Sequence, residues 1–73
     1  MSKEVAGIRI NLEKVMKEKD LNIGTLAEKA GMHRNGISKI INGKNTGIEF
    51  ETLAKLCTAL NCEVGDILEH VKE

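Results

Sequence analysis

The sequence has no proline, tryptophan or tyrosine, and Phe50 is the only aromatic residue among its 73 residues. Because β-sandwiches build their strands from aromatic and β-branched residues, this composition argues against such a fold. The apolar residues are mainly leucine, isoleucine, valine and alanine, which suit a small helical bundle. We therefore expect an all-α fold, a compact bundle of four to five helices in a single domain over residues 1–73.

Long apolar runs are missing as well. No stretch approaches the roughly 20 apolar residues that a membrane-spanning helix needs, and the first residues lack the apolar segment of a signal peptide. The two cysteines are too few for a disulfide framework. These absences predict a cytoplasmic, reduced protein with no membrane partner.

The usual marks of an enzyme or a metal site are also lacking. Cys57, Cys62 and His70 have no paired C-x-x-C spacing, and Cys57 lies within a stripe of leucines. Gly43-Lys44 lacks the earlier glycine of a phosphate-binding loop. We therefore expect no catalytic residues, no metal, no cofactor and no small-molecule substrate.

The net charge is zero, yet the charges are unevenly distributed. Between residues 29 and 48 there is no acidic residue, and four cations occur, namely Lys29, Arg34, Lys39 and Lys44. Residues 49–73 instead carry six acidic residues against two lysines. For nucleic-acid binding the distribution of charge matters more than its sum, so the basic segment is the candidate binding surface.

Two short amphipathic runs overlap the basic segment. The first, residues 23–30, places Leu26, Ala27 and Ala30 on one face at helical spacing. The second, residues 33–41, does the same with three isoleucines. Gly31 lies between them, where a helix commonly ends in a left-handed residue that glycine adopts without strain. Two helices joined by so short a turn with glycine predict a helix-turn-helix motif.

The chain resembles the Cro/C1-type (xenobiotic-response-element-like) helix-turn-helix regulators over roughly residues 8–69. The resemblance is carried by Leu26-Ala27, Ala30-Gly31, Ile37, Ile40, Asn42-Gly43-Lys44, Leu53, Leu56, Ala59-Leu60-Asn61 and Ile67-Leu68. It implies a lambda-repressor-like fold and sequence-specific binding to double-stranded DNA as a transcriptional regulator. It also implies that the helix at about 33–41 enters the major groove.

The outward residues of this recognition helix have the chemistry of base contacts. Arginine can bond guanine, and asparagine can bond adenine, each through two hydrogen bonds, and lysine reaches guanine or a phosphate. The resemblance implies base contacts from Arg34, Asn35, Ser38 and Lys39. The alternative is a solvated polar face, which any amphipathic helix shows.

Phosphate contacts are expected at the ends of both helices. The resemblance and the anion-binding character of helix starts assign this role to Asn22, Ile23, His33, Asn42, Lys44 and Asn45. Ile23 departs from the family, in which many members carry a polar side chain, so it offers only backbone N–H groups. His33 stands where many members have serine or threonine as the helix cap.

The rest of the chain is expected to be scaffold. Helices are predicted at about 11–19, 50–59 and 64–69, with residues 5–10 open between strand and helix and residues 1–7 and 70–73 frayed. The predicted core-facing residues of the last two helices include Phe50, Leu53, Leu56, Leu60, Val64, Ile67 and Leu68.

A module this small is expected to bind DNA as a homodimer on a palindromic operator, because two-fold dimers place two recognition helices in successive major grooves. The last helix and the N-terminal segment are the predicted interface. The alternative from another class is a protein-interaction module on the same fold, an antitoxin or an anti-regulator, with little DNA binding. The neutral net charge, Ile23 and Glu49 all favour this alternative.

Overall fold

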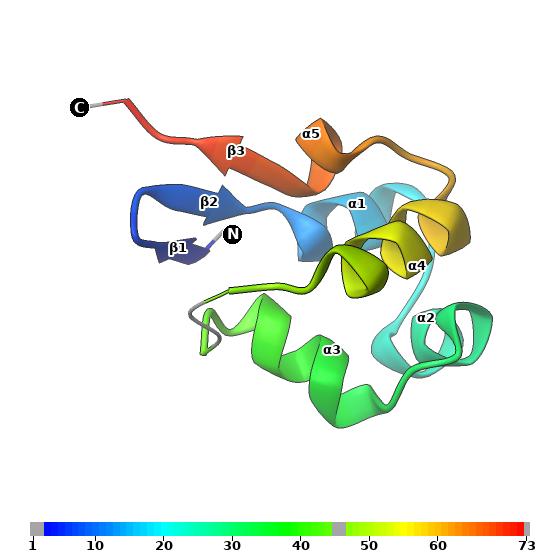
Figure 1. Ribbon diagram of the computed structural model, residues 1–73. Coiled ribbons are helices and arrows are strands. Elements are labelled where there is room, and N and C mark those ends of the chain that lie inside the picture. Colours follow the sequence, from blue (N-terminus) through cyan, green and yellow to red (C-terminus); the bar gives the residue numbers. More distant parts are fainter. Residues whose placement is uncertain (1–2, 45–46, 73) are drawn as a thin grey trace.

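The computed structural model describes residues 3–44 and 47–72. Within these residues the chain forms five helices and a three-stranded antiparallel sheet (Figure 1). In chain order the elements are β1 (Lys3–Val5), β2 (Ile8–Ile10), α1 (Leu12–Glu18), α2 (Ile23–Ala30), α3 (Arg34–Ile41), α4 (Phe50–Leu60), α5 (Val64–Ile67) and β3 (Leu68–His70). The helix count agrees with the prediction, but the all-α class is wrong, because the sheet joins the two ends of the chain.

The sheet is built from a tight hairpin and a distant third strand. β1 and β2 are joined by Ala6 and Gly7, whose φ angles of 52° and 81° are both positive, as a two-residue type I′ hairpin turn requires. β3 pairs with the other edge of β2, with Ile8 opposite His70. The sheet takes in residues from both segments that were expected to be frayed.

The two faces of the sheet differ in chemistry. On the outer face, Arg9 lies between two carboxylates, with Nη1 3.1 Å from Glu69 Oε1 and Nη2 3.8 Å from Glu4 Oε1. The opposite face carries Ile10 and Leu68, which pack with the helical core. Strand alternation produces this division, since successive side chains point to opposite faces.

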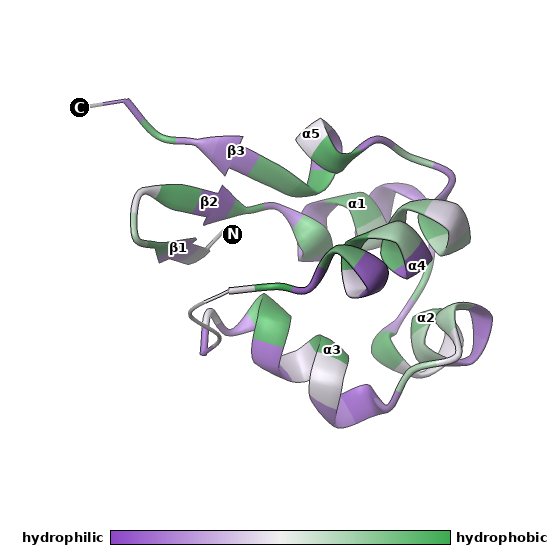
Figure 2. Cartoon of the chain, in the orientation of Figure 1, coloured by the Kyte–Doolittle hydropathy of each residue, from purple (hydrophilic) through white to green (hydrophobic). Residues whose placement is uncertain are grey.

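The helices enclose one apolar core. In Figure 2 hydrophobic residues, drawn in green, occur where the elements face one another. The completely or almost completely buried members of the core are Leu12, Leu26, Ile37, Ile40, Leu56, Leu60 and Ile67. The longest helix, α4, has 11 residues. No helix in the described part of the chain is long and apolar enough to cross a membrane.

Two predicted core residues are exposed instead. Phe50 is 88% exposed and Val64 is 47% exposed. Both residues begin a helix, α4 and α5 respectively, and side chains on a helix lean toward its N-terminus. Their side chains therefore extend beyond the turn that packs on the core. The last helix is also shorter than predicted, because residues 68–70 form β3.

Candidate nucleic-acid interface

The helix-turn-helix forms where the sequence predicts it. α2 ends at Gly31, which has a left-handed conformation with φ 67° and ψ 37°. The Met32 N–H then donates to the Ala27 carbonyl at 2.9 Å, a bond that closes the Schellman type of helix end. This reversal turns the chain directly into α3, and the prediction of a left-handed Gly31 is confirmed.

The two helices of the motif pack through small and branched residues. Leu26 and Ala27 of α2 and Ile37 and Ile40 of α3 belong to the same buried cluster. Ala27 has only a methyl group, which lets a neighbouring helix approach closely. α3 is thereby fixed by its apolar face, and its polar face is turned away from the core.

That polar face contains the predicted base-contact residues. Arg34, Asn35 and Lys39 are exposed, and their helical spacing places them on one side. Ser38 lies among them but is half-buried, and its hydroxyl oxygen accepts a hydrogen bond from Asn42 Nδ2 at 3.3 Å. The four residues therefore form one continuous polar surface along α3.

The end of α3 positions the basic residue that follows it. Gly43 has a φ of 66°, and the Lys44 N–H donates to the Lys39 carbonyl at 3.0 Å. This is a second Schellman-type end, with glycine at the left-handed position that such ends favour. Lys44 and Asn42 are both exposed here, whereas Asn45 lies outside the described residues.

A capping box closes the start of α2. Asn22 Oδ1 accepts a hydrogen bond from the Thr25 N–H at 2.8 Å, and Thr25 Oγ1 accepts one from the Asn22 N–H at 3.0 Å. Asn22 thus caps α2 together with Thr25, and the part played by Thr25 was not recognised in the sequence. The cap leaves the N–H groups of Ile23 and Gly24 as the donors of the first turn, which no carbonyl of this helix can satisfy.

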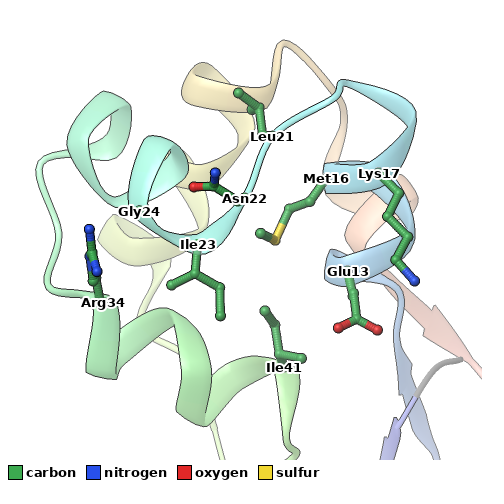
Figure 3. Close-up of a pocket in the computed structure, with 9 residues that line it drawn as sticks. All are labelled: Glu13, Met16, Lys17, Leu21, Asn22, Ile23, Gly24, Arg34 and Ile41. Atoms are coloured by element: carbon green, nitrogen blue, oxygen red, sulfur yellow. The ribbon is translucent and has the colours of Figure 1, made fainter.

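A feature that sequence reasoning missed connects the two helices of the motif. The guanidinium of Arg34 lies over Gly24, so that a Cβ atom added to Gly24 would come 2.9 Å from Arg34 Nη2. Figure 3 shows Arg34 rising from the start of α3 toward this turn, beside Asn22 and Ile23. These residues line one end of a pocket of about 570 Å³ between α1, α2 and α3. The only sequence signal was a glycine in the first turn of a helix.

The start of α3 is capped less well than that of α2. His33 has the extended backbone of a cap residue, but its side chain makes no capping hydrogen bond. The imidazole is exposed. It lies one residue before Arg34, so it borders the polar face of α3.

The basic residues at and beside the helix-turn-helix make no ion pairs within the described residues. Within residues 3–44 and 47–72, the ion pairs involve Arg9 and Lys55 and their glutamate partners. Lys29, Arg34, Lys39 and Lys44 have no ion-pair partner among these residues. Four unpaired cations near the helix-turn-helix therefore attract anions, although Glu13 lines the far end of the pocket.

The cysteines take no part in this surface. Both are free, and burial, followed by the proximity of Cys57, raises the pKa of the Cys62 thiol. In the part of the chain that the structure describes, no three histidine, cysteine or acidic side chains converge as metal ligands.

Comparison with known proteins agrees with this geometry. The sequence profile of the Cro/C1-type HTH DNA-binding domain matches residues 11–73. The chain belongs to this family. Its sequence is 35% identical over 63 residues to the uncharacterized HTH-type transcriptional regulator YozG of Bacillus subtilis (strain 168), a match that covers 86% of this chain and 75% of YozG. The predicted function, a DNA-binding transcriptional regulator, is thereby confirmed.

Two solved structures share the fold of this Cro/C1-type domain. The first is SinR, a master regulator for biofilm formation, in complex with DNA, with a TM-score of 0.71, 30% identity and coverage of 74% of this chain and 86% of that one. The second is the restriction-modification controller protein C.AhdI from Aeromonas hydrophila, with a TM-score of 0.71, 27% identity and coverage of 77% and 83%.

Proposed function

We propose that this Cro/C1-type domain recognises its operator by inserting α3 into the major groove. Arg34, Asn35, Ser38 and Lys39 supply the base contacts in this proposal. The observation that supports it is the exposure of three of these residues on a single face that lacks any acidic residue. Hydrogen bonds to base edges in the major groove distinguish all four base pairs.

Phosphates flank this face in the proposal. One phosphate is held at the start of α2 by the backbone N–H groups of Ile23 and Gly24 and by the side-chain NH2 group of Asn22. The helix dipole adds a positive potential at this end. His33, at the start of α3, contacts the DNA phosphate backbone in the proposal. Asn42, at the end of α3, and Lys44, just beyond it, contact the DNA phosphate backbone in the proposal.

Arg34 has two roles available in this arrangement. Its guanidinium lies beside the first turn of α2, a position from which it can clamp the same phosphate as the α2 amides. Rotated away from Gly24, the same side chain can reach a guanine. We propose the base contact for the bound state and treat the phosphate clamp as the alternative, because the two roles predict different mutant phenotypes.

The operator is proposed to be palindromic and the protein to bind it as a cytoplasmic homodimer. A single module offers one short recognition helix, whereas a two-fold dimer presents two to successive turns of the major groove. The predicted interface combined the last helix with the N-terminal segment. Since α5 has only four residues, the N-terminal segment supplies more of this contact in the proposal.

Binding titrations with two alanine variants test these assignments. Arg34→Ala should lose about 1–3 kcal/mol at one base pair and relax the preference there, because a bidentate base contact is removed. Lys44→Ala should weaken binding to every sequence alike and flatten the dependence of log affinity on log salt by about one unit. Lys55→Ala is the control, because Lys55 pairs with Glu51 on α4 and its loss should leave the slope unchanged.

Equal losses on all sequences for Arg34→Ala would refute its base contact and favour the phosphate clamp. A wild-type affinity that does not respond to salt would contradict the proposed surface altogether. That outcome would favour the protein-interaction module as the alternative.

A further inference from the structure

An apolar groove lies on the side of the domain that carries the sheet. It has a volume of about 290 Å³ and lies between the β1–β2 hairpin, the segment before α4 and the end of α3. Its lining is Val5, Ala6, Ile8, Ile10, Ile40, Gly47, Ile48, Phe50, Leu53 and Leu68. Every one of these residues is apolar or glycine, so water in this groove gains few hydrogen bonds from its walls.

The groove exists because the sheet is only partly covered by helices. Strand pairing puts Val5 opposite Ile8 and Leu68 opposite Ile10, so these four residues share the inner face of the sheet. Ile10 is buried by the core, whereas Val5 and Ile8 remain half-exposed. The outer part of an apolar sheet face is thus left open beside the start of α4.

Phe50 stands at the rim of this groove. It is one of the lining residues and yet 88% of it is exposed to solvent. Under two-fold symmetry each copy supplies both a ring and a groove, as an isologous interface requires. A cavity of about 150 Å³ already accepts a benzene ring, so the groove has room for the phenyl group.

The edges of the sheet are less suited to joining two copies. Glu4 is the central residue of β1, and Glu69 is the central residue of β3. Two-fold antiparallel pairing centred on either edge strand would place a glutamate opposite its own copy, and like charges directly opposite are destabilising. Pairing by strand addition is therefore disfavoured, which leaves the groove as the contact surface on this side.

We propose that the groove receives Phe50 of a second copy of this chain and that the two copies exchange their Phe50 rings across a two-fold axis. This inference rests on the proposed function for its biological role, as the homodimer that binds a palindrome. The predicted base-contact residues lie elsewhere in the fold, on the polar face of α3, so they stay free in the dimer. The lining of the groove includes Val5, Ala6 and Ile8 but no residue of α5.

The affinity of such a dimer should be low. Aromatic residues at the centre of an interface act as hot spots when they fill a pocket. A contact centred on two rings and two short grooves falls at the small end of protein interfaces. We therefore expect reversible association that depends on protein concentration and that is strengthened by operator DNA.

Sedimentation of the full chain without DNA tests the proposal. Phe50→Ala should raise the dimer dissociation constant by about a hundredfold or more, since two rings leave their grooves and each hot spot contributes about tenfold or more. Val64→Ala is the matched control, because Val64 is likewise an exposed apolar residue at the first position of a helix but does not line the groove. It should sediment as the wild type does. High salt should not weaken the wild-type dimer, because the contact is apolar.

A second variant reports on the ring itself. The chain has no tryptophan or tyrosine, so Phe50→Trp introduces a single indole as the only strong fluorophore. Its emission should shift to the blue as the protein concentration rises and the indole enters the second copy, in step with the sedimentation data. The Val5→Glu change in the same background should abolish the shift.

The outcomes separate this inference from the proposed function. A dimer that is unaffected by Phe50→Ala overturns the groove contact but leaves DNA binding as a homodimer intact. A wild-type chain that stays monomeric at all concentrations overturns the groove dimer even if one domain binds a half-site. An indole that shifts only when an unrelated protein is added assigns the groove to another partner and likewise overturns the proposal.

Discussion

Replacing Gly24 with alanine separates the stability of the fold from its binding of DNA. The new Cβ would come 2.9 Å from Arg34 Nη2 and 3.3 Å from Asn22 Oδ1. The closer atom is the end of a flexible side chain, so we expect Arg34 to rotate away while the backbone stays in place. Alanine also favours helix over glycine by about 0.5–1 kcal/mol. The free energy of unfolding should therefore stay unchanged or rise by up to about 1 kcal/mol.

The effect on DNA binding should have the opposite sign. The methyl group lies over the first turn of α2, so it crowds the N–H groups of Ile23 and Gly24 that hold a phosphate in the proposed complex, whereas the displaced Arg34 can still reach a guanine. We expect the affinity for operator DNA to fall by about tenfold, which corresponds to about 1.4 kcal/mol. Thermal unfolding and fluorescence-anisotropy titration of the same preparation measure the two quantities.

Gly65→Ala provides the matched control for this change. Gly65 is also helical, in α5, and an added Cβ would meet nothing within 4 Å. It should leave DNA affinity as in the wild type. If Gly24→Ala bound DNA with wild-type affinity, the first turn of α2 would hold no phosphate. A large loss of stability would show that the backbone, rather than Arg34, gives way.

Two further predictions concern the cap of α2 and the outer face of the sheet. Asn22→Ala should destabilise the domain by about 1 kcal/mol through loss of the cap, a change of about 4–8 °C in Tm. Asn22→Asp should keep the cap and still weaken DNA binding, because it adds a negative charge beside the phosphate; unchanged affinity would exclude a phosphate there. Hydrogen bonds from Asn11 and then Arg9 hold the pKa of Glu69 below its usual range. The contribution of Glu69 to stability should thus be complete above its unfolded-state pKa and be lost as the pH falls through its folded-state pKa. Carboxyl NMR titration should show a lower titration midpoint for Glu69 in the folded chain than in urea, and Asn11→Ala should raise the midpoint of the folded chain. Equal midpoints in the folded and unfolded chains would contradict the lowered pKa.

The helix-turn-helix could be predicted from the sequence because its signals are local. Helical spacing marks the apolar faces of α2 and α3, and glycine marks both turns that need a positive φ. Asn61 likewise takes a left-handed conformation after α4, a position where asparagine is a typical residue after glycine. Each of these signals depends on residues within a few positions of one another, which is the range over which sequence patterns are informative.

The sheet could not be predicted in the same way. Its strands have three residues each, too few for alternation to stand out. Its turn uses Ala6 at positive φ, where asparagine or aspartate would be the typical signal. β3 pairs with β2 across almost the whole chain, and nothing local marks such a pairing.

The exposure of the candidate site residues could be predicted from the sequence, but their spatial arrangement could not. The exposed positions on α3 follow from helical spacing. The approach of Arg34 to Gly24 depends on how α2 and α3 cross, which only the packed structure supplies. Phe50 was misplaced because helical periodicity does not show that the first residue of a helix can extend past the core.

Selection of bound sites from random duplex DNA tests the central claim most directly, that the exposed face of α3 reads base pairs. The measurement should be made on the wild type and on Arg34→Ala in parallel. We predict that the wild type enriches a palindrome and that the variant loses preference at one symmetric pair of positions. Recovery of unenriched, random sequences by the wild type would contradict the account.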